Sequence, residues 1–88
     1  MVEKKITIKN KLGLHARPAA LFVQMANKFE SEIRVKKGSQ EVDGKSIMGI
    51  LTLAAEQGSL IKITAIGLDA EQALGELEKL LSGGLMEE

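Results

Sequence analysis

The sequence contains no cysteine, tryptophan or tyrosine, only two phenylalanines, and a single histidine and proline. Without cysteine, disulfide bonds and thiolate chemistry are excluded, and one histidine does not make a zinc site of the usual kind. Aromatic platforms are scarce, and the 12 basic residues are balanced by 12 acidic ones, which argues against nucleic-acid binding. We therefore expect no metal, no cofactor and no nucleic-acid partner.

A long apolar run is also missing. The opening residues, MVEKK, do not resemble a signal peptide, and no stretch is long enough to cross a bilayer. We expect a cytoplasmic protein with no membrane insertion. Its 88 residues, 44% hydrophobic and 27% charged, fit one folded domain over residues 1–88, with residues 83–88 as a loose tail.

The apolar residues recur with the two periods that distinguish strands from helices. They predict strands at 2–9, 32–36, 40–42 and 60–66, and helices at 16 to 27 or 28, 47–53 and 70–81. An α+β fold, with a mainly antiparallel four-stranded sheet and the helices on one face, buries every apolar stripe. Asp69 and Gln72 have capping-box spacing at the last helix. The open sheet face is expected to carry Lys5, Thr7, Arg34, Lys36, Lys62 and Thr64 into water.

Residues 10–20, NKLGLHARPAA, mark the change from a strand pattern to a helix pattern. Gly13 suits a sharp turn because it adopts backbone angles closed to other residues. Pro18 fits the first helical turn, where backbone N–H groups have no intrahelical partner. His15 is therefore expected at or beside the N-cap of the helix, with Arg17 two residues later.

This placement gives the imidazole a chemical environment suited to phosphate. The free N–H groups and the positive end of the helix dipole attract anions. They and Arg17 disfavour a charged ring, and only the neutral ring has a lone pair for attack on phosphorus. Most single histidines in small domains are solvated or structural, but this context favours His15 as a phosphoryl carrier and Arg17 as a phosphate clamp.

A second candidate region begins at Ser46, which can cap the helix at 47–53. Capping is the simplest interpretation of Ser46, although the helix end would also favour a phosphate on its hydroxyl. The apolar residues of this short helix cannot all face the core. We expect Ile47 and Met48 to be exposed contact residues beside His15, the alternative being that they cover the edge of the core.

Residues 13–19, GLHARPA, resemble the active-site signature of the HPr family, the histidine-containing phosphocarriers of the bacterial phosphoenolpyruvate-dependent phosphotransferase system (PTS). Residues 45–49, KSIMG, resemble the regulatory-serine segment of that family, and the similarity extends over the whole chain. The resemblance implies an open-faced β-sandwich. It also implies a carrier rather than a conventional enzyme.

The resemblance further implies a route for phosphate. Enzyme I, charged by phosphoenolpyruvate, would phosphorylate Nδ1 of His15, which would pass the group to a histidine of a IIA protein or domain. Ser46 would be the target of an HPr kinase/phosphorylase, and its phosphorylation would weaken acceptance at His15. The expected partner-binding residues are Leu12, Leu14, Ala16, Ala20, Ile47, Met48 and Leu51.

Several alternatives stay open. Residues 10–13, NKLG, and 82–85, SGGL, look more like the nitrogen-related branch of the family, whereas the Ser46 segment points to the regulated sugar branch. The chain could instead be a regulatory module that binds a transcriptional regulator when Ser46 is phosphorylated. A small ligand- or RNA-binding domain with an incidental histidine is disfavoured by the balanced charge and the missing aromatics.

Overall fold

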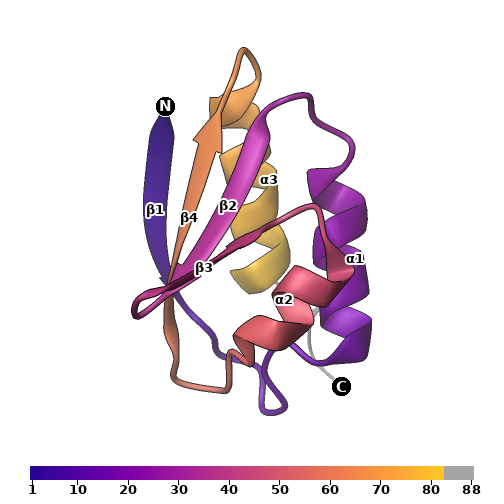
Figure 1. Cartoon of the computed structure of the whole chain (residues 1–88), viewed down its shortest axis with the longest axis vertical. Helices are drawn as coiled ribbons and strands as arrows, with labels where there is room; N and C mark the ends of the chain where they lie inside the picture. The colour runs from indigo at the N-terminus through magenta and orange to yellow at the C-terminus, as the bar shows by residue number, and fades with distance from the viewer. Residues whose placement is uncertain (83–88) are drawn as a thin grey trace.

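The computed structural model describes residues 1–82 (Figure 1). Its elements follow the predicted order: β1 (Val2–Thr7), α1 (Ala16–Ala26), β2 (Glu32–Lys37), β3 (Gln40–Asp43), α2 (Ile47–Leu53), β4 (Leu60–Ile66) and α3 (Ala70–Ser82). The first strand is shorter than predicted, because Ile8 leaves the ladder and bonds to the turn that precedes β4. The tail predicted for residues 83–88 lies outside the described residues.

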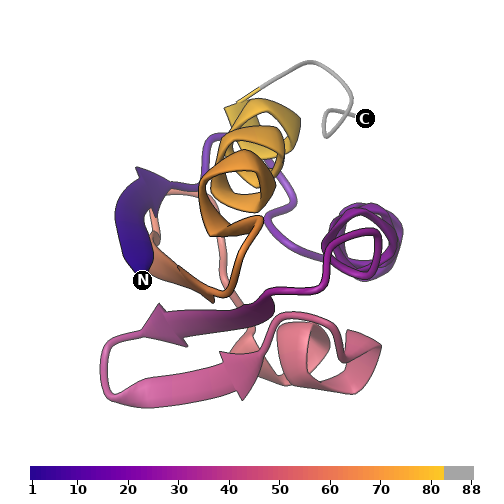
Figure 2. The ribbon, with the colours of Figure 1, turned by 90° about the horizontal axis from the view of Figure 1, so that it is seen from above.

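The four strands form one antiparallel sheet in the order β1-β4-β2-β3. Figure 2 shows the three helices on the same side of this twisted sheet, while its other face is left open. The predicted open-faced sandwich is therefore confirmed. Within the described part of the chain, every helix is too short or too polar to cross a bilayer.

The core lies between the sheet and the helices and is almost entirely aliphatic. Phe22 of α1 is fully buried, and the small side chains of Ala19 and Ala26 on the same face let this helix pack closely. The apolar stripe of α3 is buried: Ala73, Leu74, Leu77, Leu80 and Leu81. Val23 of α1 and Phe29, which follows this helix, are only partly buried against this core.

Thr64 corrects the prediction that every polar residue of the open face is solvated. Only 7% of its surface is exposed. Its cross-strand neighbours on that face are Glu3 and Arg34, which both have longer side chains. Alternation assigned Thr64 to the correct face, but the exposure of a residue also depends on the length of its neighbours.

Asp69, at the start of α3, has a different role from the predicted capping box. Its carboxylate accepts hydrogen bonds from the Glu30 N–H (2.9 Å), the Ser31 N–H (3.0 Å) and the Ser31 hydroxyl. Gly67 lies so close that a Cβ there would be 2.6 Å from the Ser31 Oγ. The carboxylate thus ties the start of α3 to the segment between α1 and β2.

This tether should make stability depend on acid pH. The hydrogen bonds from Ser31 and Glu30 lower the pKa of Asp69 from its usual value of 3.8. A depressed folded-state pKa adds stability above the unfolded pKa, and this stability is lost as the pH falls through the folded pKa. Asp69→Asn should therefore lower the Tm at neutral pH, and the difference from wild type should narrow below about pH 4. Thermal unfolding followed by circular dichroism tests this, and a pH-independent difference would contradict it.

Candidate functional site

The segment that precedes α1, residues 8–15, forms a tight turn that we call the motif loop. Gly13 lies in the left-handed region with φ +69°, and a Cβ there would be only 2.3 Å from the Ala55 carbonyl oxygen. Asn10 Nδ2 donates to the Gly13 carbonyl (2.5 Å), and the Leu14 N–H donates to the Ala55 carbonyl (2.8 Å). Glycine is therefore required both by the backbone angle and by the close approach of residue 55.

The motif loop is also anchored to the turn between α2 and β4. The Gly58 N–H donates to the Ile8 carbonyl (2.8 Å), and the Ile8 N–H donates to the Ser59 carbonyl (2.9 Å). Gln57 Nε2 donates to the Lys9 carbonyl at 3.1 Å. The local sequence of residues 56–59, EQGS, indicates only a turn. Their role in positioning the loop depends on hydrogen bonds between segments far apart in the sequence, for which no local signal exists.

His15 is the N-cap residue of α1, as predicted. Its backbone is extended (φ −85°, ψ −168°), and its carbonyl accepts the first helical hydrogen bond from Ala19 at 2.9 Å. The imidazole forms no capping hydrogen bond with the helix. The side chain is partly exposed, whereas its Nε2 atom is buried. The ring is thus held at the helix end without being used to cap it.

The first turn of α1 is suited to an anion. It contains no acidic side chain, so its own residues do not neutralise the positive end of the dipole. Pro18 is buried in this turn, as its sequence position predicts, and Arg17 is exposed. His15 and Arg17 thus both lie at the start of α1, where unpaired backbone N–H groups and a guanidinium favour a bound anion.

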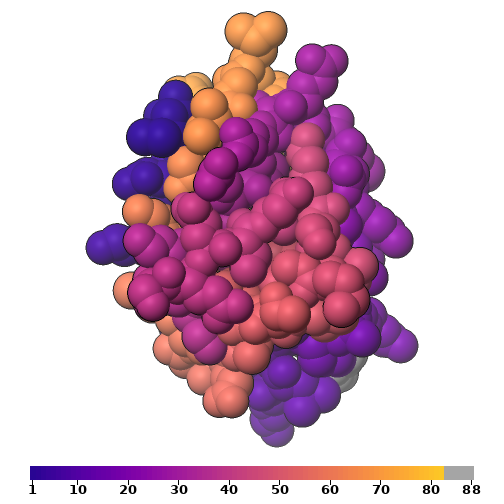
Figure 3. All heavy atoms as spheres, viewed as in Figure 1, coloured from indigo at the N-terminus to yellow at the C-terminus, as the bar shows by residue number. Residues whose placement is uncertain are grey.

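An open hollow joins the motif loop to the C-terminal end of α2. It is lined by Leu12, Leu14, His15, Ala16, Leu51, Ala54, Ala55 and Glu56. Ala54 ends α2 in the left-handed conformation (φ 53°), which turns the chain toward the motif loop. Figure 3 shows α2 and the motif loop as neighbouring parts of one face. Ser46 and His15 therefore begin two helices that share a surface.

Apolar side chains are exposed on this face. Ile47 and Met48 are among them, as predicted from the fact that the short helix cannot bury all its apolar residues. The exposed fractions are 62% for Leu12, 65% for Met48, 37% for Ile47 and 36% for Leu51. With the exposed Ala16, these residues define what we call the apolar surface. Among the other expected contact residues, Ala20 is half-buried.

Leu14 does not belong to the apolar surface, contrary to the prediction. It is only 4% exposed and is part of the hydrophobic core. The turn at Gly13 and the hydrogen bond from its own N–H to Ala55 direct this leucine inward. Leu14, the residue directly before His15, is therefore anchored in the core.

Ser46 caps α2, as predicted. Its Oγ accepts a hydrogen bond from the Gly49 N–H at 3.1 Å. Lys45, the residue before Ser46, is held by the C-terminal end of α1, because Asn27 Nδ2 donates to the Lys45 carbonyl (3.2 Å). Lys45 Nζ donates in turn to the Phe29 carbonyl at 2.6 Å. The segment that carries Ser46 is thus packed against the C-terminal end of the helix that His15 begins.

Comparisons with known proteins agree with these features. The family model described as PTS HPr component phosphorylation site matches residues 2–83. The HPr-like protein Crh of Halalkalibacterium halodurans is 51% identical over 77 residues (88% of this chain, 92% of Crh), and phosphocarrier protein HPr of Neisseria meningitidis serogroup A is 45% identical over 83 residues (94% and 93%). A crystal structure of HPr-C-His from Thermoanaerobacter tengcongensis superimposes with a TM-score of 0.95 at 52% identity, covering 100% and 99% of the two chains.

Proposed function

Since the chain belongs to the HPr family of PTS phosphocarrier proteins, we propose that His15 is the residue that carries its phosphoryl group. Phospho-enzyme I donates the group, and a histidine of a IIA protein or domain receives it. The observation that carries this proposal is the position of His15 as the N-cap of α1, with its imidazole not committed to capping. Burial of Nε2 favours Nδ1 as the reacting nitrogen.

The transfer is a displacement at phosphorus. The lone pair of Nδ1 attacks, a bond between nitrogen and phosphorus forms, and the bond between phosphorus and the donor histidine breaks. The amide groups at the start of α1 and the guanidinium of Arg17 then stabilise the negative charge of the phosphoryl group. The same steps in reverse transfer the group to the IIA histidine, so one arrangement serves both acceptance and donation.

The apolar surface is the proposed docking site for both partners. Enzyme I and a IIA protein must each bring a histidine to His15, so they use the same face in turn. Met48 is the most exposed of the large side chains on this surface. Its flexible, polarizable side chain suits a contact that must fit two different proteins.

Met48→Asp should slow both transfer steps by about tenfold or more, because it places a charge in the middle of an apolar contact. The fold should be unaffected, since 65% of this side chain is exposed. Leu68→Asp is the matched control, because Leu68 is fully exposed in the turn between β4 and α3, at the other end of the molecule (Figure 1). Rapid-quench measurement of each transfer step tests the prediction, which fails if the two variants behave alike.

Ser46 is the proposed site of regulation by an HPr kinase/phosphorylase. A phosphate on its Oγ would be favoured by the start of α2, and it would place negative charge next to Ile47 and Met48 on the apolar surface. Docking of partners would weaken as a result. A second candidate function is a module that binds a transcriptional regulator when Ser46 is phosphorylated; it is favoured by the similarity to Crh, which is described in Bacillus subtilis as the catabolite repression HPr. Kinase-dependent binding of a regulator that survives His15→Ala would support this second function.

The proposed carrier function is tested by incubating the chain with enzyme I and labelled phosphoenolpyruvate. A phosphohistidine predicts a label that is labile in acid and stable in alkali, and that leaves the chain when a IIA protein is added. An acid-stable label, or none, would contradict the proposal. Whether a sugar-branch or a nitrogen-branch IIA protein removes the label would identify the branch.

A further inference from the structure

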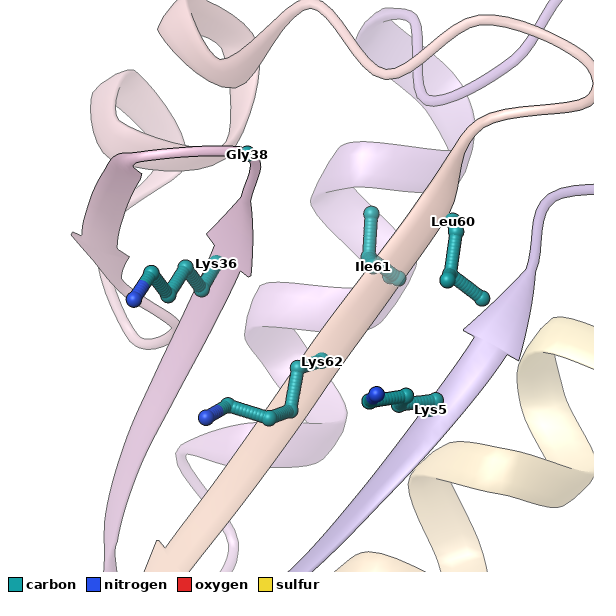
Figure 4. A pocket seen from close by; sticks show the side chains of 6 residues that line it. All are labelled: Lys5, Lys36, Gly38, Leu60, Ile61 and Lys62. Atoms are coloured by element: carbon teal, nitrogen blue, oxygen red, sulfur yellow. The ribbon is translucent and has the colours of Figure 1, made fainter.

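The open face of the sheet carries an unusual row of charges. In the register of the strands, Lys5 of β1 lies opposite Lys62 of β4, and Lys62 lies opposite Lys36 of β2. We call these three residues the lysine row. Figure 4 shows them on three adjacent strands around one hollow. Three side chains of the same charge are thus direct cross-strand neighbours.

This arrangement costs stability, because like charges directly opposite each other in a sheet repel. The next row along the same face is mixed in charge: Glu3, Thr64, Arg34 and Asp43. Lysine on an edge strand often serves to prevent edge-to-edge pairing. That explanation suits Lys5 on β1, but Lys62 and Lys36 are on the two central strands. The row therefore calls for another explanation.

Carboxylates compensate this charge only weakly. Lys62 Nζ is 3.8 Å from a carboxylate oxygen of Glu3. Over residues 1–82, no carboxylate oxygen lies within 4.0 Å of the ammonium groups of Lys5 and Lys36. Glu41 lies opposite Lys36, but its carboxylate is bonded to Arg34 at 3.0 Å. The lysine row keeps most of its positive charge, although the whole chain has a formal net charge of zero.

The hollow beside the lysine row is small and has no acidic lining. It has a volume of about 220 Å³ and is lined by Lys5, Lys36, Gly38, Leu60, Ile61 and Lys62 (Figure 4). Gly38, in the turn between β2 and β3, has no atom within 4 Å of its would-be Cβ, so this end of the hollow is open. Its size is below the range of about 300–1,000 Å³ for drug-sized pockets. A compact anion fits it better than a large organic ligand.

We propose that the lysine row binds a linear oligophosphate, as found in inorganic tripolyphosphate and in nucleoside triphosphates. Adjacent strands are about 4.8 Å apart, so the three lysine Cα atoms span roughly 10 Å. An extended acidic peptide would present its same-side charges only about 6.7 Å apart, so it would bring fewer negative charges to this span than an oligophosphate, which is charged at every phosphate. Closely spaced phosphates can contact all three ammonium groups at once.

The composition of the chain limits recognition to the phosphates. A base would need an aromatic platform, and the two phenylalanines of this chain pack on the helical side of the sheet. Inorganic tripolyphosphate should therefore bind about as tightly as ATP. The lysine row faces away from α1, so its occupancy should not block His15.

The test is an NMR titration of ¹⁵N-labelled protein with inorganic tripolyphosphate at low salt. Shift changes should centre on Lys5, Lys36, Gly38, Leu60 and Lys62. Lys62→Gln should weaken binding about fivefold, the value expected for losing one exposed ion pair, whereas Lys62→Arg should retain it. Lys28→Gln, an exposed lysine after α1, is the charge-matched control and should bind like wild type. Lys5→Gln, on the edge strand, repeats the test if Lys62→Gln unfolds.

Separate arms of the titration distinguish the source of the phosphate. ATP should give the same shift pattern and similar affinity, and adenosine should give none. Binding of ATP without binding of tripolyphosphate would overturn the proposal, because it would mean that the base is recognised. Shift changes confined to residues 12–17, or an affinity that Lys62→Gln and Lys5→Gln leave unchanged, would overturn it as well.

Discussion

Replacing His15 by alanine is expected to abolish phosphate transfer from enzyme I to this chain. His15 is the only histidine in the sequence, which also contains no cysteine, so no other side chain of either type can accept the group. Enzyme I and labelled phosphoenolpyruvate should label wild type and leave the variant unlabelled. A IIA protein added to the variant should likewise receive no label through it.

The fold should tolerate this replacement. Loss of a side-chain cap costs about 1 kcal/mol in an ordinary helix, but the imidazole of His15 forms no capping hydrogen bond with α1. The Tm of His15→Ala should therefore remain close to that of wild type, which separates loss of chemistry from loss of structure. Label that persists in a folded His15→Ala variant would contradict the assignment of this residue.

Gly13→Ala is expected to have the largest effect on stability. An L-residue in the left-handed region costs about 1–2 kcal/mol, and overpacking a tight contact adds about 1–3 kcal/mol. The new Cβ would be 2.3 Å from the Ala55 carbonyl oxygen, which is backbone and cannot rotate away. We expect a loss of about 3 kcal/mol, or a Tm lower by roughly 12–24 °C for a domain of this size.

The same substitution should also slow phosphorylation of His15. Relief of the clash requires the motif loop to separate from Ala55, which breaks the hydrogen bond donated by Leu14 and displaces the residue before the imidazole. Transfer from enzyme I, measured by rapid quench below the Tm of the variant, should therefore be slower than in wild type.

Gly38→Ala is the matched control for this prediction. Gly38 has a similar backbone angle (φ 61°), but no atom lies within 4 Å of its would-be Cβ. Its replacement should cost only the backbone strain, about 1 kcal/mol, and leave phosphorylation unchanged. Equal destabilisation in the two variants would mean that contact with Ala55 does not constrain the motif loop.

Local signals in the sequence were sufficient to predict the helices and strands and the roles of the turn and cap residues at their ends. Gly38 lies in the turn between the predicted strands at 32–36 and 40–42, Ser46 caps α2, and His15 is the N-cap of α1 because Pro18 fits only the first helical turn. Each of these features depends on residues within a few positions of one another. The exposure of Ile47 and Met48 followed from the same kind of reasoning, since a short helix has only one face to bury.

Features that depend on distant segments were missed or assigned wrongly. Leu14 was expected on the surface, but its N–H bonds to Ala55 and its side chain is buried. Asp69 matched a local capping pattern, yet its carboxylate bonds to Glu30 and Ser31, almost forty positions earlier. Spacing along the chain could not indicate either partner, because each pair meets only after the sheet and helices have packed.

The sequence by itself determined which residues form strands and helices, and that an imidazole beside an arginine begins one of the helices, because periodicity, caps and turns act over a few neighbouring positions. Only the tertiary structure decided that Leu14 is buried and that three lysines from separate strands meet in one row. Those properties depend on strand register and on packing between distant segments, which local sequence does not encode.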